Sequence, residues 1–437
     1  MIVPGPRPGR GPATDVPLRY LLAAAAAFIL AAVGVAWLGP ELAGHYYHPR
    51  VAALAHTVTL GWITLAIMGA SYQLIPIVLE RPIWSERLAR WQFWLLLPGV
   101  SGMAAHFYLG TWPGLVLAAG LVTLGVVLHL VNVLLSLRGF DRWTFTARLV
   151  VLAYAGLGLT TVFGLLLGAD HVVKVLPGEF FPTLHAHVHL ALLGWVMPMV
   201  LGVAARVYPM FLLAPEPRGW PERMQFWGLA AGVPAVVLGL LLRLPAASIG
   251  GALAVAAAGG GHLAWVVQMA RHRRRPRLDW ALRLVLTGAA FAVPGGLLGL
   301  GLAFDLIAGP RLALAYAVLV LGGWVSLTIA GMMLKIVPFL VWYRVYGPRA
   351  GKAPVPTLRE LSWGRAEGTA GVLLTAGVIG LAAAVAAGSA DAIRAAGLVL
   401  SLGALAFAAA LARILAHLAR RARNGTPMAT RWVEAKR

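Results

Sequence analysis

Four histidines in this chain have the spacing of residues that bind a metal or a metal-containing cofactor. Three form the run His185-Ala-His187-Val-His189, and His56 stands in another apolar stretch. Because a helix turns about 100° per residue, His185 and His189 share a face, whereas His187 points nearly opposite. Three purely structural histidines would each need a partner where polar groups are scarce. The run therefore predicts cofactor or metal binding on two sides of one helix.

His56 and His189 occupy the same place in a repeated motif. The motif reads Gly-Trp, six residues, Gly, three residues, a long polar side chain, two residues and Pro. Its three copies begin at Gly61, Gly194 and Gly323. Five residues ahead of the copies lie His56, His189 and Val318, so one copy lacks the imidazole. Five matched positions in each copy predict a threefold internal repeat.

The long polar residue of the motif is Gln73 in the first copy, Arg206 in the second and Lys335 in the third. Each lies near the end of an apolar stretch, where such side chains reach to the membrane interface. A second interpretation is that the three side chains ring an inner vestibule, where they hold cofactor propionates or stabilise helix ends broken by proline. His129 and His262 are isolated on apolar stretches, and we interpret them as packed, hydrogen-bonded residues.

The composition places these residues in a membrane. Hydrophobic residues make up 60% of the chain, which is more than one soluble core can bury, and charged residues make up only 12%. Stretches long enough to span a bilayer lie at about 17–39, 51–79, 91–109, 113–137, 145–168, 182–213, 223–243, 246–270, 281–304, 311–343, 367–388 and 392–416. The sequence therefore predicts an all-α polytopic membrane protein, with twelve transmembrane helices in three four-helix repeats.

We expect one membrane domain, residues 17–416, between cytoplasmic tails at 1–16 and 417–437, with a connector at 344–365. The net charge is +21, and Arg and Lys gather at alternate connections and in the C-terminal tail. This distribution predicts that both termini are cytoplasmic in a cell inner (plasma) membrane, with His56 and His189 toward the outer face. The basic residues indicate topology and attraction to the lipid bilayer, and no nucleic-acid partner is expected.

The ligand types available restrict the cofactor. The chain has no cysteine, which excludes thiolate metal sites and covalent haem attachment. If the repeats surround a pseudo-threefold axis, the helices of His56 and His189 are neighbours. Two opposed neutral imidazoles suit the axial positions of a haem better than zinc. We expect one b-type haem between them, while His187 faces the next crevice and holds a second haem or, with His185, a copper ion.

Two stretches resemble a known family. His56 followed by Met68-Gly69-Ala70-Ser71-Tyr72-Gln73-Leu74-Ile75-Pro76 resembles helix II of haem–copper oxidase subunit I, particularly the nitric oxide reductase branch. There the histidine is an axial ligand of the low-spin haem. His187-Val188-His189 with Gly194-Trp195 is similar to helix X of the C-family terminal oxidases, where the pair serves two haems. The resemblance implies a twelve-helix fold of three arcs, haem b near the outer face, and a cytochrome c-type or other respiratory partner.

The chain departs from that family at the catalytic centre. The His-x-His pair lies on the sixth predicted helix instead of the tenth, and the histidines of copper-B are missing. The NnrS family of nitric oxide-response proteins is a more distant likeness, with Leu190 where its glutamate would stand. We therefore expect a haem protein of respiratory electron transfer or nitric oxide metabolism, with a degenerate centre and no assigned catalytic residue. The alternative is a membrane transporter or assembly factor that handles haem or copper.

Overall fold

The computed structural model describes residues 14–78, 81–216 and 219–424, and all regular structure in these ranges is helical. The elements are α1 (Asp15–Trp37), α2 (Gly39–Leu42), α3 (Pro49–His56), η1 (Thr57–Thr64), α4 (Leu65–Val78), α5 (Glu86–Leu109), α6 (Trp112–Ser136), α7 (Phe145–Asp170), α8 (Phe180–His189), η2 (Leu190–Val196), α9 (Met197–Leu212), α10 (Trp220–Leu241), α11 (Pro245–Arg271), α12 (Trp280–Ala303), α13 (Pro310–Ala317), η3 (Val318–Ser326), α14 (Leu327–Val345), η4 (Gly347–Arg349), α15 (Leu358–Leu361), α16 (Gly364–Ala387) and α17 (Ala390–Asn424).

Within the described residues, eleven helices are long and apolar enough to cross a membrane. The chain is therefore an all-helical, multi-pass membrane protein. The remaining long helix is α5, which coincides with the stretch expected at 91–109. It has 24 residues, but it is less apolar because it includes Gln92 and His106 besides a charged first turn.

The two ends of the described chain lie on the same side of the bundle. α17 packs antiparallel to α1, since Gly397 near its start meets Ala36 near the end of α1. α1 begins at Asp15, within the tail expected at 1–16, and α17 continues to Asn424, past the end expected at 416. The rest of the two predicted tails lies outside the described residues.

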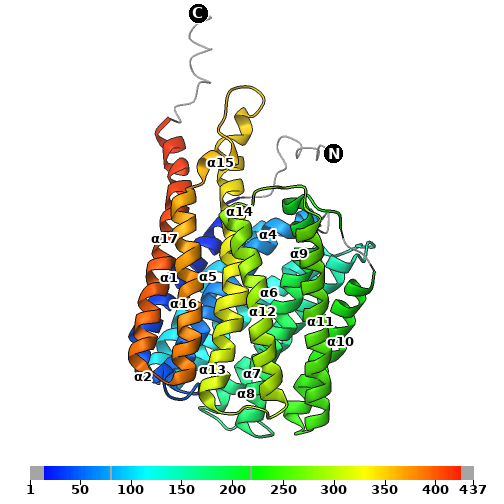
Figure 1. Cartoon of the computed structure of the whole chain (residues 1–437), viewed down its shortest axis with the longest axis vertical. Coiled ribbons are helices and arrows are strands. Elements are labelled where there is room, and N and C mark those ends of the chain that lie inside the picture. The colour runs from blue at the N-terminus through cyan, green and yellow to red at the C-terminus, as the bar shows by residue number, and fades with distance from the viewer. Residues whose placement is uncertain (1–13, 79–80, 217–218, 425–437) are drawn as a thin grey trace, which may run out of the picture.

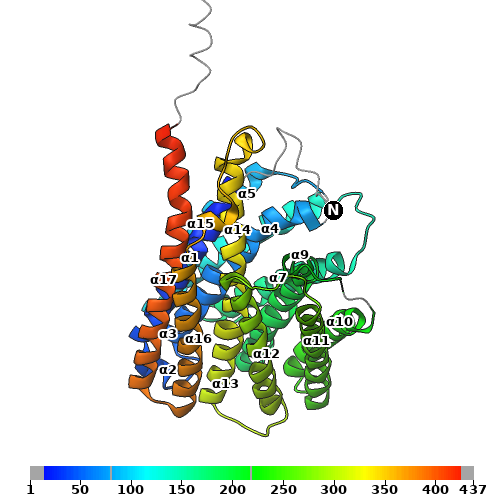
Figure 2. The same ribbon diagram turned by 45° about the horizontal axis from the view of Figure 1, so that its top comes forward.

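The long helices form three sets with matching packing. Helix set 1 runs from α1 to α6, helix set 2 from α7 to α11, and helix set 3 from α12 to α17. In each set the first helix packs on the helix that carries the Gly-Trp motif, and the last two helices pack on each other. Figures 1 and 2 show α16 and α17 at one edge of the bundle and α10 and α11 at the opposite edge.

Helix ends follow local signals in the sequence. Pro49 and Pro310 open α3 and α13, where the missing N–H of proline costs no hydrogen bond. Gly110 and Gly388 end α5 and α16 in the left-handed conformation that glycine adopts without strain. Asp279 caps α12 by accepting a hydrogen bond from the third residue of that helix.

Each Gly-Trp pair lies within a π-helical segment of its motif helix. These segments are η1, η2 and η3, and they begin directly after His56, directly after His189 and at Val318. A π-helical turn contains more residues than an α-helical turn, and such turns are frequent at functional sites. The position that holds His56, His189 or Val318 therefore lies where the α-helix passes into the π-helical segment.

The glycines of the motif let the first helix of each set approach closely. A Cβ added at Gly331 would lie 2.5 Å from the carbonyl oxygen of Ala281, and one at Gly202 would lie 3.0 Å from Leu149 Cβ. The closest approach joins Gly156 of α7 to Gly194 of η2, where a Cβ on Gly156 would lie 2.0 Å from the Gly194 oxygen. These contacts confirm the packing role expected for small residues between membrane helices.

The tryptophans of the motif hydrogen-bond from one motif helix to the next. The indole N–H of Trp62 donates to Ser326 Oγ at 3.0 Å, and that of Trp195 donates to Thr64 Oγ1 at 3.3 Å. Thr64 and Ser326 stand at the same place, three residues beyond the glycine of their motifs. The matching residue of the second motif is Met197, which has no hydroxyl group. Trp62 and Trp195 therefore link neighbouring motif helices as well as packing in the core.

We expect Gly156→Ala to destabilise the protein by about 1–3 kcal/mol, because the added methyl group meets backbone that cannot move aside like a side chain. The measurement is the thermal unfolding midpoint of the purified protein. Gly296→Ala is the matched control, since nothing lies within 4 Å of a Cβ at that helical position. Equal midpoints for the two variants would contradict the packing account.

Candidate functional site

Three of the predicted histidines share one hydrogen-bonding arrangement. In each, Nδ1 bonds a backbone carbonyl: His56 to Ala52 O (2.8 Å), His189 to His185 O (2.8 Å) and His187 to Thr160 O (3.1 Å). Because a carbonyl oxygen only accepts, Nδ1 carries the proton and Nε2 keeps its lone pair. Within the described residues no hydrogen bond reaches these Nε2 atoms. Histidines that bind metals are held in this way.

His56 and His187 belong to one crevice between helix sets 1 and 2. The two imidazoles lie within electrostatic range of each other. Gly164 of α7 makes room for the His187 ring, since a Cβ there would lie 3.0 Å from its Cε1 atom. On the other side, the His56 ring stacks on Phe107 of α5, with centroids 4.7 Å apart. The structure thus brings His187 toward His56, whereas the sequence led us to expect His189.

His189 faces a second crevice, between helix sets 2 and 3. Its ring lies parallel to the ring of Tyr316 in α13, with centroids 6.4 Å apart and planes 20° apart. Tyr316 stands seven residues ahead of its motif glycine, which is the place of His187 in the second motif. The corresponding positions for a third crevice are Val318 and Leu54, and both are apolar.

His185 has a different environment from the other histidines of its run. Its Nε2 bonds the hydroxyl of Tyr46 at 2.9 Å, and His171 Nε2 bonds the hydroxyl of Tyr47 at 3.1 Å. These bonds tie the segment between α2 and α3 to helix set 2. Across the ranges that the structure describes, no group of three or more His, Cys, Asp or Glu side chains could hold a metal ion. Copper between His185 and His187 therefore has no support from this arrangement.

The polar residues of the three motifs do not converge on one space. Gln73 is buried, and its Oε1 has no hydrogen-bond partner among the described residues. Arg206 is exposed and pairs with Glu216 at 3.4 Å. Lys335 is half-buried and pairs with Asp279. Arg206 and Lys335 thus fit the interfacial interpretation, and the arrangement does not support an inner vestibule ringed by all three.

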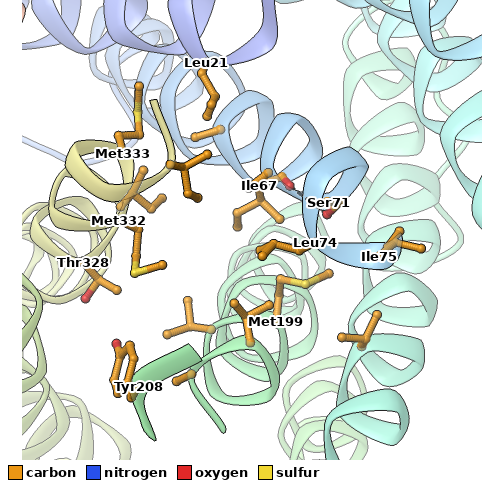
Figure 3. A pocket seen from close by; sticks show the side chains of 18 of the residues that line it. Leu21, Ile67, Ser71, Leu74, Ile75, Met199, Tyr208, Thr328, Met332 and Met333 are labelled. Atoms are coloured by element: carbon orange, nitrogen blue, oxygen red, sulfur yellow. Dashed lines mark hydrogen bonds between the residues drawn. The ribbon is translucent and has the colours of Figure 1, made fainter. Parts of the chain in front are cut away.

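A central cavity that the sequence did not predict lies between the motif helices. Its volume is about 90 Å³, and its lining is almost entirely apolar. Each motif contributes the residues five, six, nine and ten positions beyond its first glycine: Ala66, Ile67, Ala70, Ser71, Met199, Val200, Val203, Ala204, Thr328, Ile329, Met332 and Met333. Figure 3 shows Met199, Met332 and Met333 around this space. The repeated offsets were the signal for it in the sequence.

A buried polar cluster in helix set 1 was also missed. The hydroxyl of Tyr72 donates to Gln92 Oε1 and bonds His129 Nδ1 at 3.0 Å. The amide nitrogen of Gln92 donates to Met68 Sδ at 3.4 Å. This cluster confirms the hydrogen-bonded interpretation of His129 at Nδ1, whereas its Nε2 has no partner among the described residues. For His262 that interpretation is wrong at Nδ1, which has no partner among the described residues.

Comparison with known proteins does not place the chain in a family: no family model matches it, and no curated protein sequence matches it. The class that the fold defines is a multi-pass helical membrane protein. The candidate ligands are the imidazoles of His56, His187 and His189, whose Nε2 atoms have no hydrogen-bond partner among the described residues.

We expect Lys335→Met to destabilise the protein by about 1 kcal/mol, because it removes one of the two cations that pair with the Asp279 carboxylate and leaves only Arg275. Arg206→Met should have almost no effect, since that pair is exposed. Burial alone would raise the pKa of Asp279, but the hydrogen bond and charge of Lys335, the Leu282 N–H and the charge of Arg275 together outweigh burial and lower it.

A carboxyl with a lowered pKa stabilises the fold above its unfolded pKa, and the contribution is lost as the pH falls through the folded value. The difference in unfolding midpoint between wild type and Lys335→Met should therefore be largest near neutral pH and shrink below about pH 4. A difference that does not change with pH would show that the lysine acts through packing alone.

Proposed function

We propose that this chain is a haem-binding membrane protein with twelve transmembrane helices in three four-helix repeats, resembling haem–copper oxidase subunit I. The matched packing of the three helix sets and the shared offsets of the cavity lining support the repeats. α5 supplies the twelfth span. The basic connections support an inner-membrane protein whose termini both face the cytoplasm.

The observation that carries the proposal is the pair His56 and His187, two imidazoles from different helices with anchored Nδ1 atoms. These residues would hold one b-type haem, which would supply one-electron redox chemistry when bound. The carbonyls of Ala52 and Thr160 fix the tautomer and the plane of each ring. Gly164 leaves room for the His187 ring, and Phe107 fixes the opposite face of His56.

His189 is available to hold a second haem in the neighbouring crevice, where its companion is the Tyr316 ring instead of an imidazole. The proposed role is electron transfer near the outer face or the metabolism and sensing of nitric oxide. A cytochrome c-type protein or another respiratory subunit would be the partner. Because the ligands of copper-B are missing from the sequence, no dioxygen-reducing centre is proposed.

Purified protein should show the Soret band of a low-spin b-type haem, and His56→Ala and His187→Ala should each abolish it or shift it to high spin. Each variant removes one of two axial ligands. The measurement is the absorption spectrum with a pyridine haemochrome assay per mole of protein. His189→Ala should leave the low-spin signal of this pair unchanged.

His171→Ala is the matched control, because both of its ring nitrogens already have partners. It should keep the low-spin spectrum. Purified, folded protein that contains no haem would contradict the proposal. Loss of the low-spin signal in His189→Ala but not in His187→Ala would restore the pair expected from the sequence.

A second candidate is a transporter or assembly factor that handles copper or haem. The observation that favours copper is the central cavity, because Met199, Met332 and Met333 line it and thioethers are ligands that Cu(I) prefers. Its position between all three motif helices suits a path through the bundle. Under this candidate the metal is cargo and should exchange with free metal in solution.

If copper is cargo, Met332→Leu combined with Met333→Leu should weaken Cu(I) binding by about tenfold or more, since leucine keeps the volume but removes the sulfur. Competition with a Cu(I) chelator measures the affinity. Met210→Leu is the control, because that methionine is exposed and lies outside the cavity lining. Equal affinities for the double variant and wild type would exclude this route.

A further inference from the structure

A buried glutamine and histidine recur at matching places in helix sets 1 and 2. Gln92 and His129 follow Gly61 by 31 and 68 residues, and Gln225 and His262 follow Gly194 by the same numbers. All four side chains are at most 3% exposed. Two polar pairs at identical offsets inside apolar helices indicate a shared structural place, with the glutamine on the third long helix of each set and the histidine on the fourth.

In helix set 1 a tyrosine satisfies this pair. The Tyr72 hydroxyl lies between the two side chains, donates to Gln92 Oε1 and bonds His129 Nδ1. Tyr72 stands eleven residues beyond its motif glycine. His129 Nδ1 also lies 3.3 Å from Gln92 Oε1, so the hydroxyl group from the motif helix completes a three-way cluster with the two buried polar groups.

In helix set 2 that tyrosine is missing. The residue eleven positions beyond Gly194 is Ala205. Gln225 Oε1 and His262 Nδ1 have no hydrogen-bond partner among the described residues, and these are the counterparts of the two atoms that Tyr72 serves. The amide orientation of Gln225 is fixed, because its nitrogen donates to the Pro221 carbonyl at 3.1 Å. Its oxygen therefore needs a donor.

Helix set 3 shows that the packing does not require a polar pair. Its last two helices approach at Gly377 and Leu400, as α10 and α11 do at Gly232 and Val255. The two contacts are 145 residues apart in the sequence. By the same offset, Ala370 and Phe407 of helix set 3 correspond to Gln225 and His262 of helix set 2. An apolar pair thus fills the same place. Buried polar atoms without partners are costly, so their presence in helix set 2 calls for a ligand.

We propose that helix set 2 binds a small hydroxyl-bearing molecule between Gln225 and His262, at the place that the Tyr72 phenol occupies in helix set 1. The hydroxyl donates to Gln225 Oε1 and shares a hydrogen bond with His262 Nδ1. Two sources supply this chemistry: an ordered water, and the hydroxyl of a phenol or hydroquinone dissolved in the membrane. This site does not depend on haem binding.

The surroundings suit an aromatic hydroxyl compound. The rings of Tyr208 and Trp265 lie 6.4 Å and 6.3 Å from the His262 ring, so aromatic side chains stand beside it. Tyr208 also lines the central cavity, as Figure 3 shows, so one of the rings beside His262 reaches that cavity. Ala205 has no aromatic ring, whereas Tyr72, at the corresponding position of helix set 1, contributes one.

The direct test is an experimental structure of the full-length wild-type protein at a resolution that resolves waters. We expect density within hydrogen-bond distance of both Gln225 Oε1 and His262 Nδ1. A single-atom peak identifies water, and a flat, larger feature identifies a phenol or hydroquinone. Absence of density, with the two side chains bonded to each other or to the protein, would overturn the proposal.

The binding test uses p-cresol, which is the tyrosine side chain as a free molecule, with toluene as the control that lacks the hydroxyl. If the site takes phenols, p-cresol should raise the unfolding midpoint by about 2–4 °C, toluene should not, and Ala205→Tyr should abolish the response. If the site takes water, p-cresol has no effect, and the density peak is a single atom. No response to p-cresol together with no density would exclude both sources.

Discussion

Two buried hydrogen bonds between indole N–H groups and hydroxyls hold the motif helices in register, and the positions of the functional side chains depend on them. Trp62 reaches Ser326, and Trp195 reaches Thr64, so each bond joins neighbouring helix sets. Water does not compete for such bonds in an apolar interior, and the geometry they impose is specific. They fix the π-helical segments against one another at one level. The histidines that begin these segments therefore face crevices at matching depth.

Local patterns in the sequence were sufficient to locate the long apolar helices. Apolar stretches marked the long helices, and the alternation of His187 and His189 placed their rings on two sides of one helix. The pairing across the crevice was not predicted, because equivalent positions point the same way around a threefold arrangement, so that His56 meets the position of His187 and not that of its own equivalent, His189. The place of Tyr316 beside His189 was not predicted, because a tyrosine at this position does not indicate a ligand site when only one sequence is read. α5 was recognised as a long helix from the length of its apolar stretch, although Gln92 makes that helix less apolar.

The three helix sets share a backbone plan but differ in chemistry. The first crevice holds two imidazoles, the second an imidazole and a phenol, and the third has aliphatic residues at the same positions. The buried glutamine–histidine pairs follow the same division, since helix set 3 has Ala370 and Phe407 in their place. Helix set 3 is thus apolar at these places, although it also carries buried polar side chains such as Glu367, whose Oε1 has no partner among the described residues. The matched packing of the three sets accounts for the architecture, and their different residues at matching places account for the differences in chemistry.

The π-helical segments also divide each motif helix into two mechanically distinct halves. The half before the π-helical segment carries the histidine position, and the half after it lines the central cavity. A π-helical turn corresponds to an extra residue in an α-helix, so it rotates everything beyond it about the helix axis. The direction in which the crevice ligands point from the helix axis is thereby independent of the direction in which the cavity-lining residues point. Substitution on one side of the turn can change the chemistry there without rotating the other side out of its packing.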